Sequence, residues 1–250
     1  MRTHRFSLLF FLLLSLLFNA CGKPEHKREW KIAFDPSWYP LDLMGREKQL
    51  QGFTTDLLHE WGKVEKLKIL MVQDNWDTLI SNLQKKESDA ILSSLQPYLF
   101  YEKQFDFSEP FLLTGPILVV PAESNSKSLE EFSGKEIAVI SGSQADLSIE
   151  KYPGIIIRYY EAIPDAFNAI LTGQVDGAVV GVLPAAAYCQ DLYQGKLKVV
   201  GHPLTAQGLR LITLYNEAPL LIESFNTMLK ELKKSGKYAK IARKWKFPEE

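Results

Sequence analysis

The sequence predicts an α/β fold, and two features of the chain after residue 29 carry that prediction. Short segments rich in Ile and Val alternate with longer segments whose apolar residues recur every three or four positions. The short segments are apolar on both faces, as buried parallel strands are, and the longer ones have the period of amphipathic helices. Strands and helices in alternation favour βαβ units around a sheet. The chain has 250 residues, of which 46% are hydrophobic, enough for one large domain or two small ones.

The individual elements follow from the same two patterns. Strands are predicted at residues 30–34, 68–72, 89–92, 117–120, 136–140, 155–159, 177–180, 198–201 and 209–215. Helices are predicted at residues 54–63, 76–86, 144–151, 164–172, 184–191 and 219–234. Asp74 and Asn75 are both candidate N-caps for the helix that starts at Trp76, because their side chains accept hydrogen bonds from free helix amides. The last helix carries an apolar stripe that predicts a core-facing side: Leu221, Phe225, Met228, Leu229 and Leu232.

The first 20 residues predict an export signal. Arg2 and Arg5 precede an apolar stretch at residues 6–18, interrupted only by two serines. This stretch is shorter than the roughly 20 residues that a membrane-spanning helix needs, but it has the length of a signal-peptide core. The ending Leu-Phe-Asn-Ala-Cys resembles a bacterial lipobox, in which Cys21 becomes the lipid attachment site. We therefore expect a lipoprotein signal at residues 1–20, a linker at 21–29 and an extracytoplasmic, membrane-anchored protein; a plain signal peptide with a chance cysteine stays the alternative.

Cysteine count and charge exclude several classes of protein. Cys189 is the second of two cysteines, so an acylated Cys21 leaves no partner for a disulfide, and Cys189 is expected to be a buried structural thiol. The formal net charge of −1 gives no indication of nucleic-acid binding. Basic residues between 230 and 244 fit a solvated helix face better than a nucleic-acid patch. The four histidines are scattered without metal-ligand spacing, so neither a metal nor another cofactor is expected.

Several short stretches share an order and spacing with a known family. They include Ser37-Trp38-Tyr39-Pro40-Leu41, Gly52-Phe53-Thr54-Thr55-Asp56-Leu57, Asn75-Trp76-Asp77, Phe105-Asp106-Phe107-Ser108-Glu109-Pro110-Phe111, Ser141-Gly142-Ser143 and Leu171-Thr172-Gly173-Gln174-Val175-Asp176. Together they resemble the family 3 solute-binding proteins of polar amino-acid ABC transporters. The resemblance runs from Trp30 to about Trp245. Each stretch is weak alone, but their colinearity is specific.

The resemblance implies a periplasmic-binding-protein type II fold, in which two Rossmann-like lobes are joined by a two-strand hinge. Lobe 1 would comprise residues 28–113 and 207–250, and lobe 2 residues 114–206, with hinges near 114–116 and 205–208. It also implies a function: the substrate-binding component of an ABC importer, which captures a small polar solute, an amino acid or a similar molecule, between the lobes. Its expected partners are permease and ATPase subunits, and a monomer is expected.

The resemblance also implies a set of ligand-binding residues. Trp38 and Trp76 fall where the family places residues that sandwich the ligand, although a core role is open for either. The loop 141–144 falls where backbone amides bind a carboxylate, and it also fits a helix cap. The residues expected to bind the ligand are Trp38, Trp76, Ser93, Ser94, Gln96, Tyr101, Ser141, Ser143 and Gln144.

The sequence departs from the family at the charged positions. Tyr101 stands where amino-acid binders have the Arg that contacts the α-carboxylate, and Gly181 stands where they have the Asp that holds the α-ammonium. Because Tyr does not replace a guanidinium, we expect a solute without a free zwitterionic head, or one held by neutral hydrogen bonds and aromatic faces. Three other cations are candidates to reach the cleft instead: Arg46, Arg158 and Arg210.

Two further functions stay open at this point. The missing charged pair also fits a ligand sensor or surface binding protein that takes no part in transport. A dehydratase-like enzyme on the same fold is the other alternative, with the carboxylates of Asp35, Asp74 and Glu109 as candidate acids or bases. Turn or cap roles are the competing interpretation for Asp35 and Asp74. Neither a Gly-rich phosphate loop nor a GxSxG motif is present in the sequence.

Overall fold

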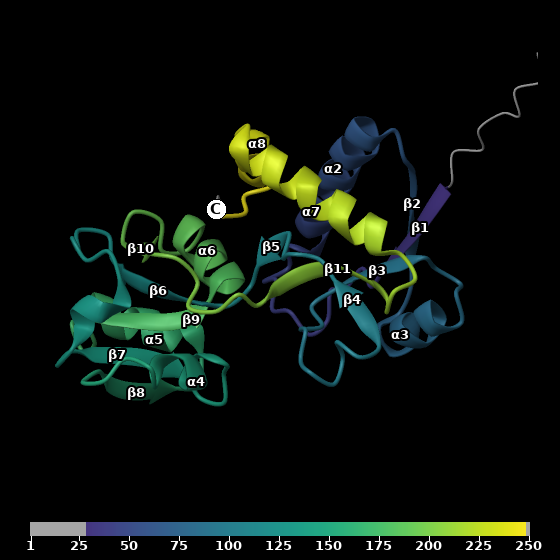
Figure 1. Cartoon of the computed structure of the whole chain (residues 1–250). Helices are drawn as coiled ribbons and strands as arrows, with labels where there is room; N and C mark the ends of the chain where they lie inside the picture. Colours follow the sequence, from purple (N-terminus) through teal and green to yellow (C-terminus); the bar gives the residue numbers. More distant parts are fainter. Residues whose placement is uncertain (1–28, 249–250) are drawn as a thin grey trace, which may run out of the picture.

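The computed structural model describes residues 29–248 and contains two β-sheets, each covered by its own helices (Figure 1). This confirms the predicted α/β class. The predicted leader at 1–20, the linker up to residue 28 and the lipid site at Cys21 lie outside the described residues. Within residues 29–248, no helix is both long and apolar enough to cross a membrane.

The larger sheet has six strands, and we call it, with its helices, lobe 1. Its order is β2-β1-β3-β11-β4, with β5 paired to β11. β1 runs parallel to β2 and β3, whereas β11 is antiparallel to β3, β4 and β5. The strands span Glu29–Phe34 (β1), Lys68–Gln73 (β2), Ala90–Ser93 (β3), Phe105–Phe107 (β4), Leu112–Leu113 (β5) and Gly208–Leu214 (β11).

Four helices belong to lobe 1: α2 (Glu47–Glu65), α3 (Trp76–Gln84), α7 (Pro219–Lys234) and α8 (Lys237–Lys244). All five residues of the predicted stripe on α7 are buried, which confirms its core-facing side. Asn75 is the N-cap of α3, because its side chain accepts the Asp77 N–H at 2.9 Å. Asp74 instead accepts from the Asn75 N–H and from Thr78 Oγ1, so it fixes the same turn from one residue earlier.

The second sheet has five strands in the order β10-β6-β9-β7-β8, and with its helices it forms lobe 2. Its strands are β6 (Pro116–Pro121), β7 (Glu136–Ile140), β8 (Ile156–Tyr160), β9 (Gly177–Gly181) and β10 (Leu197–Val200). β7 is parallel to β8 and β9, and β6 is antiparallel to β9 and β10. The helical segments are η2 (Leu129–Phe132), α4 (Ala145–Ile149), α5 (Ile163–Leu171) and α6 (Val182–Gln190).

Two chain segments cross between the lobes, at 114–115 and at 201–207, and they lie side by side. The Thr114 N–H donates to the Gln207 carbonyl at 2.9 Å, and the Leu204 N–H donates to the Pro116 carbonyl at 2.7 Å. A Cβ on Gly115 would fall 2.4 Å from Thr205 Oγ1, so the close approach of the two segments requires glycine here. The predicted hinge positions fall within or beside these segments, and the hinge role itself stays a prediction.

The sequence patterns misplaced some elements. α2 begins at Glu47 and not at residue 54, because Leu50 and Phe53 extend its buried face into a segment that is otherwise polar. β4, β5, η2 and α8 were not predicted. The expectation of parallel strands is wrong for β6, β10 and β11: the core covers β6 and β11 on both faces, so their apolar runs resemble those of parallel strands.

Candidate functional site

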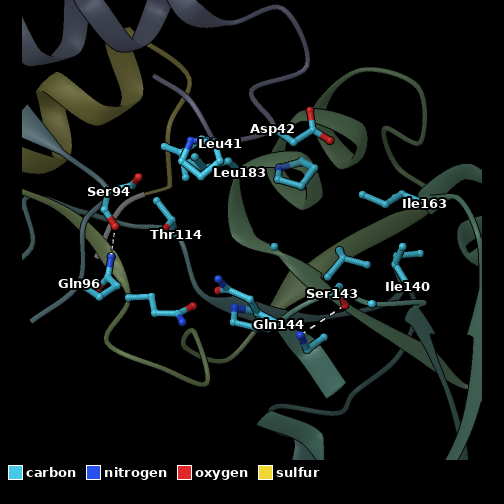
Figure 2. A pocket seen from close by; sticks show the side chains of 18 residues that line it. Leu41, Asp42, Ser94, Gln96, Thr114, Ile140, Ser143, Gln144, Ile163 and Leu183 are labelled. Carbon is cyan, nitrogen blue, oxygen red and sulfur yellow. Dashed lines mark hydrogen bonds between the residues drawn. The ribbon is translucent and has the colours of Figure 1, made fainter. Parts of the chain in front are cut away.

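A cavity of about 390 Å³ lies between the two lobes and beside both crossing segments. Figure 2 shows its walls: Ser94 and Gln96 come from the segment after β3, and Ser143 and Gln144 from the segment between β7 and α4. The volume is that of a small-molecule site. The lining residues are Pro40, Leu41, Asp42, Ser94, Gln96, Thr114, Pro116, Ile140, Gly142, Ser143, Gln144, Ala145, Ile163, Val180, Gly181, Leu183, Pro184 and Gln207.

The lobe 1 wall presents a fixed hydrogen-bond acceptor. Gln96 Nε2 donates to the Ser94 carbonyl at 2.6 Å and to the Gly208 carbonyl at 3.0 Å. Two carbonyl partners settle which end of the amide is nitrogen, because a carbonyl accepts and does not donate. Gln96 therefore keeps its Oε1 for another partner, and its amide joins the end of β3 to the start of β11, beside the crossing segments.

The lobe 2 wall uses much of its own hydrogen-bonding capacity. The Ser143 N–H donates to the Ile140 carbonyl at 3.0 Å, and the Ala145 N–H donates to Ser143 Oγ at 3.3 Å. The Asp146 N–H donates to the Ser143 carbonyl at 3.3 Å. In Figure 2, Gln144 lies beside Ser143 on the side of the hollow opposite Ser94. The turn is thus held by its own hydrogen bonds, and among its described residues the amides of Gly142 and Gln144, which both line the cavity, have no partner.

Charge in the cavity is sparse and negative. Among the described residues that line it, Asp42 is the one with a charged side chain. Asp42 is exposed, and its Oδ1 accepts the Met44 N–H at 3.1 Å, which fixes the carboxylate at the rim. Because no cation shares this wall, the cavity favours positive charge over negative charge.

The three candidate cations are engaged elsewhere. Arg46 contacts Asp191 at 2.6 Å, and this pair bridges lobe 1 to the end of α6 in lobe 2. Arg158 pairs with Glu136 at 2.6 Å on lobe 2. Arg210 donates to the Ser108 carbonyl at 2.6 Å and to the Ala206 carbonyl at 2.9 Å. None of the three lines the cavity.

The structure brings four of the nine predicted residues to the cavity: Ser94, Gln96, Ser143 and Gln144. Trp38 is only 2% exposed and stacks on Phe34 at 5.5 Å between ring centroids, so the core role is the one that its surroundings support. The rings of Trp76 and Tyr39 meet edge-on, with 5.4 Å between their centroids, and Trp76 lines a separate groove.

The other three predicted residues also lie outside the cavity lining. Ser93 is buried in β3, and its Oγ accepts the Leu95 N–H at 3.2 Å. Tyr101 packs its ring against Phe100 and Phe105, with 5.3 and 6.4 Å between the ring centroids. Ser141 Oγ donates to the Glu161 carboxylate at 3.1 Å.

Sequence reasoning missed several cavity residues, and the reasons differ. Thr114 and Gln207 lie in the predicted crossing segments, so their place beside a cleft could have been inferred. Leu183 and Pro184 lie in the first turn of α6, which begins right after Gly181, a position that the resemblance to the family marks. Asp42 has no sequence signal, because its place depends on the turns that follow β1.

The sequence also matches the model of a known protein family. The model of the bacterial extracellular solute-binding proteins, family 3, matches residues 30–249. The chain belongs to this family. The match confirms the resemblance seen in the sequence, and the family is one of solute-binding proteins.

Characterised relatives extend over nearly the whole chain. An arginine-binding periplasmic protein of Mannheimia haemolytica is 27% identical, covering 93% of this chain and 97% of its own length. A histidine-binding periplasmic protein of Escherichia coli is 26% identical over 86% of each chain. The L-cystine solute receptor of Neisseria gonorrhoeae, in its unliganded open conformation, has a TM-score of 0.70 at 18% identity and covers 90% of this chain and 95% of its own. This likeness confirms the two-lobed fold.

Cys189 lies on α6 and is half-buried, where full burial was expected, and this partial burial raises the pKa of its thiol to about 11. The thiolate is the reactive form, so a raised pKa slows reaction with disulfide reagents. In a Cys21→Ser chain, we expect Cys189 to react with a chromogenic disulfide at least about 100-fold more slowly in the native protein than in guanidinium chloride at mildly alkaline pH. Equal rates in the two states would show an accessible thiolate. Cys189→Ser supplies the blank.

Proposed function

We propose that this protein is the substrate-binding component of an ABC importer, which captures a small polar solute, an amino acid or a similar molecule, for delivery to a membrane permease. The observation that carries the proposal is the cavity whose walls come from both lobes and from both crossing segments. A solute there contacts both lobes at once, so its binding energy favours their approach. The arginine-binding and histidine-binding relatives are similar to this chain along nearly its full length, and they support a substrate of the amino-acid type.

The proposed action is capture without chemistry. Two carboxylates considered as candidate acids or bases already accept several hydrogen bonds in turns. Asp35 accepts from the N–H groups of Ser37 and Trp76, at 2.8 and 3.1 Å. Asp74 accepts from Thr78 Oγ1 and from Asn82 Nδ2, at 2.7 and 2.9 Å. These contacts support structural roles for both groups, and within residues 29–248 no cluster of His, Cys, Asp or Glu has a geometry that could hold a metal ion.

The proposal includes the place of the protein in the cell. Residues 1–20 direct export, and Cys21 carries the lipid that tethers a monomeric binding protein outside the cytoplasm, within reach of its permease and ATPase partners. A lipid-free variant separates the parts of this proposal. Cys21→Ser is expected to leave the protein exported but soluble, whereas wild type partitions into detergent. If both proteins partition equally, Cys21 does not carry a lipid anchor.

The direct test of function is the solute that the protein retains. We expect native mass spectrometry of the chain, purified from its own cells without denaturation, to show a small polar molecule bound one to one, released by unfolding. Adding this molecule back to the emptied protein should raise its Tm. A protein that carries no solute and whose Tm responds to no member of an amino-acid and small-polar-solute panel contradicts the proposal.

A further inference from the structure

We infer that the captured solute is a small organic cation without a free carboxylate, an amine or a guanidine. The inference rests on the proposed function and narrows it. Three properties of the cavity carry it: the sign of its charge, the lack of a cationic donor for an anion among its described lining residues, and its apolar wall.

The acceptors of the cavity suit a cation. Asp42 supplies a carboxylate, and Met44 holds this group in place through Oδ1 and leaves Oδ2 for a ligand. Gln96 supplies a second acceptor, Oε1, because its nitrogen is committed to two backbone carbonyls. An ammonium or guanidinium has only donors to satisfy, and these two groups offer acceptors on the lobe 1 wall.

The donors of the cavity do not suit a carboxylate. The cations that could neutralise one are held by other partners: Arg46 by Asp191, Arg158 by Glu136, and Arg210 by two carbonyls. The amides of Ser141, Ser143, Ala145 and Asp146 donate within lobe 2, so among the described residues of this loop the amides of Gly142 and Gln144 are the two left for an anion, and no cation supports them. A carboxylate that enters a closing cleft must lose its water, and neutral side-chain donors replace that hydration poorly. Removing the carboxylate from the solute therefore strengthens binding here.

The lobe 2 wall suits a hydrocarbon body. Ile140, Ile163, Val180, Leu183 and Pro184 line this side of the cavity, where Figure 2 shows Ile140 and Ile163 together at one end. Aliphatic or aromatic carbon placed there is removed from water at a gain in free energy. An alkyl amine or an alkyl guanidine combines this body with a cationic end for Asp42, while Gln96 offers its acceptor on the opposite side of the hollow (Figure 2).

Matched pairs of solutes test the inference, because each pair differs by one carboxylate. Calorimetric titration is made on the emptied full-length protein with agmatine and arginine, cadaverine and lysine, and histamine and histidine. We expect at least one amine or guanidine to bind, at least about 100-fold more tightly than its carboxylated partner. An amino acid that binds as tightly as its decarboxylated partner overturns the inference. So does a set in which none of the three amines binds.

Two variants test which carboxylate is responsible. Asp42→Asn is expected to weaken binding of the best amine by about tenfold or more and to reduce the dependence of affinity on salt. Glu123→Gln removes an exposed carboxylate that does not line the cavity, and it should bind as wild type does. If both variants bind alike, Asp42 does not hold the cation.

The outcomes distinguish a failure of the cationic class from a failure of the binding function. If mass spectrometry finds a retained solute that is an amino acid or an anion, and this solute raises the Tm, then the binding function stands and the cationic class is wrong. If no solute of any charge is retained or stabilises the protein, both fail together.

Discussion

Replacing Gly208 with alanine is expected to lower the free energy of unfolding by about 3 kcal/mol, since overpacking a close backbone contact forces the main chain to move. Gly208 is the first residue of β11, where the chain re-enters lobe 1 from the second crossing segment. A Cβ built there would lie 2.5 Å from the Leu112 carbonyl oxygen and 2.7 Å from Pro110 Cβ. That carbonyl belongs to β5, whose pairing with β11 joins the ends of the two crossing segments. Urea unfolding of wild type and variant measures the loss.

Gly181→Ala is the matched control. Its added Cβ would meet Pro184 at 3.5 Å, an ordinary contact, and its φ of −55° suits alanine. We expect its free energy of unfolding to stay within about 0.5 kcal/mol of wild type. If the urea unfolding curves of Gly208→Ala and wild type have the same midpoint and slope, β5 and β11 are not in close backbone contact at Gly208.

Replacing Arg210 with leucine is expected to cost about 2 to 3 kcal/mol of unfolding free energy, because a buried acceptor loses its charged donor. The guanidinium ties the second crossing segment to lobe 1 through the Ala206 carbonyl, and it also serves the Ser108 carbonyl. Burial lowers the pKa of Arg210, an effect that the negative charge of Glu109 opposes.

Arg158→Leu provides the comparison for Arg210→Leu. Arg158 lies on an exposed face of lobe 2 and pairs there with Glu136, so solvent screens the pair and its removal should change stability little. Thermal unfolding of the two variants side by side ranks them. If Arg158→Leu lowers the Tm more than Arg210→Leu does, the hydrogen bonds of Arg210 are not the more important ones for stability.

Local patterns determined most of the fold and only part of the site. α7 was predicted with its exact bounds, because Pro219 opens it and its stripe is unbroken, whereas the polar residues around Glu47 hid the start of α2. Trp38 shows the limit for the site: its ring stacks on Phe34, a packing choice that no spacing encodes.

Contacts across long sequence separations explain the remaining gaps. Arg46 was a candidate for the cleft, but it pairs with Asp191, which is 145 residues away in the sequence. The two crossing segments bring Thr114 and Gln207 to the same cavity from opposite ends of lobe 2. Sequence periodicity carries no information on either pairing. The charge of the cavity and the residues that line it could therefore be found only from the structure.

The two lobes are expected to approach each other around a solute in the cavity lined by Gln96 and Gln144. Small-angle X-ray scattering of the purified protein, with and without the solute that mass spectrometry identifies, tests it most directly. We predict a smaller radius of gyration in the presence of the solute, and no such change with a solute that leaves the Tm unaltered. A radius of gyration that stays constant while the solute binds would contradict closure of the lobes.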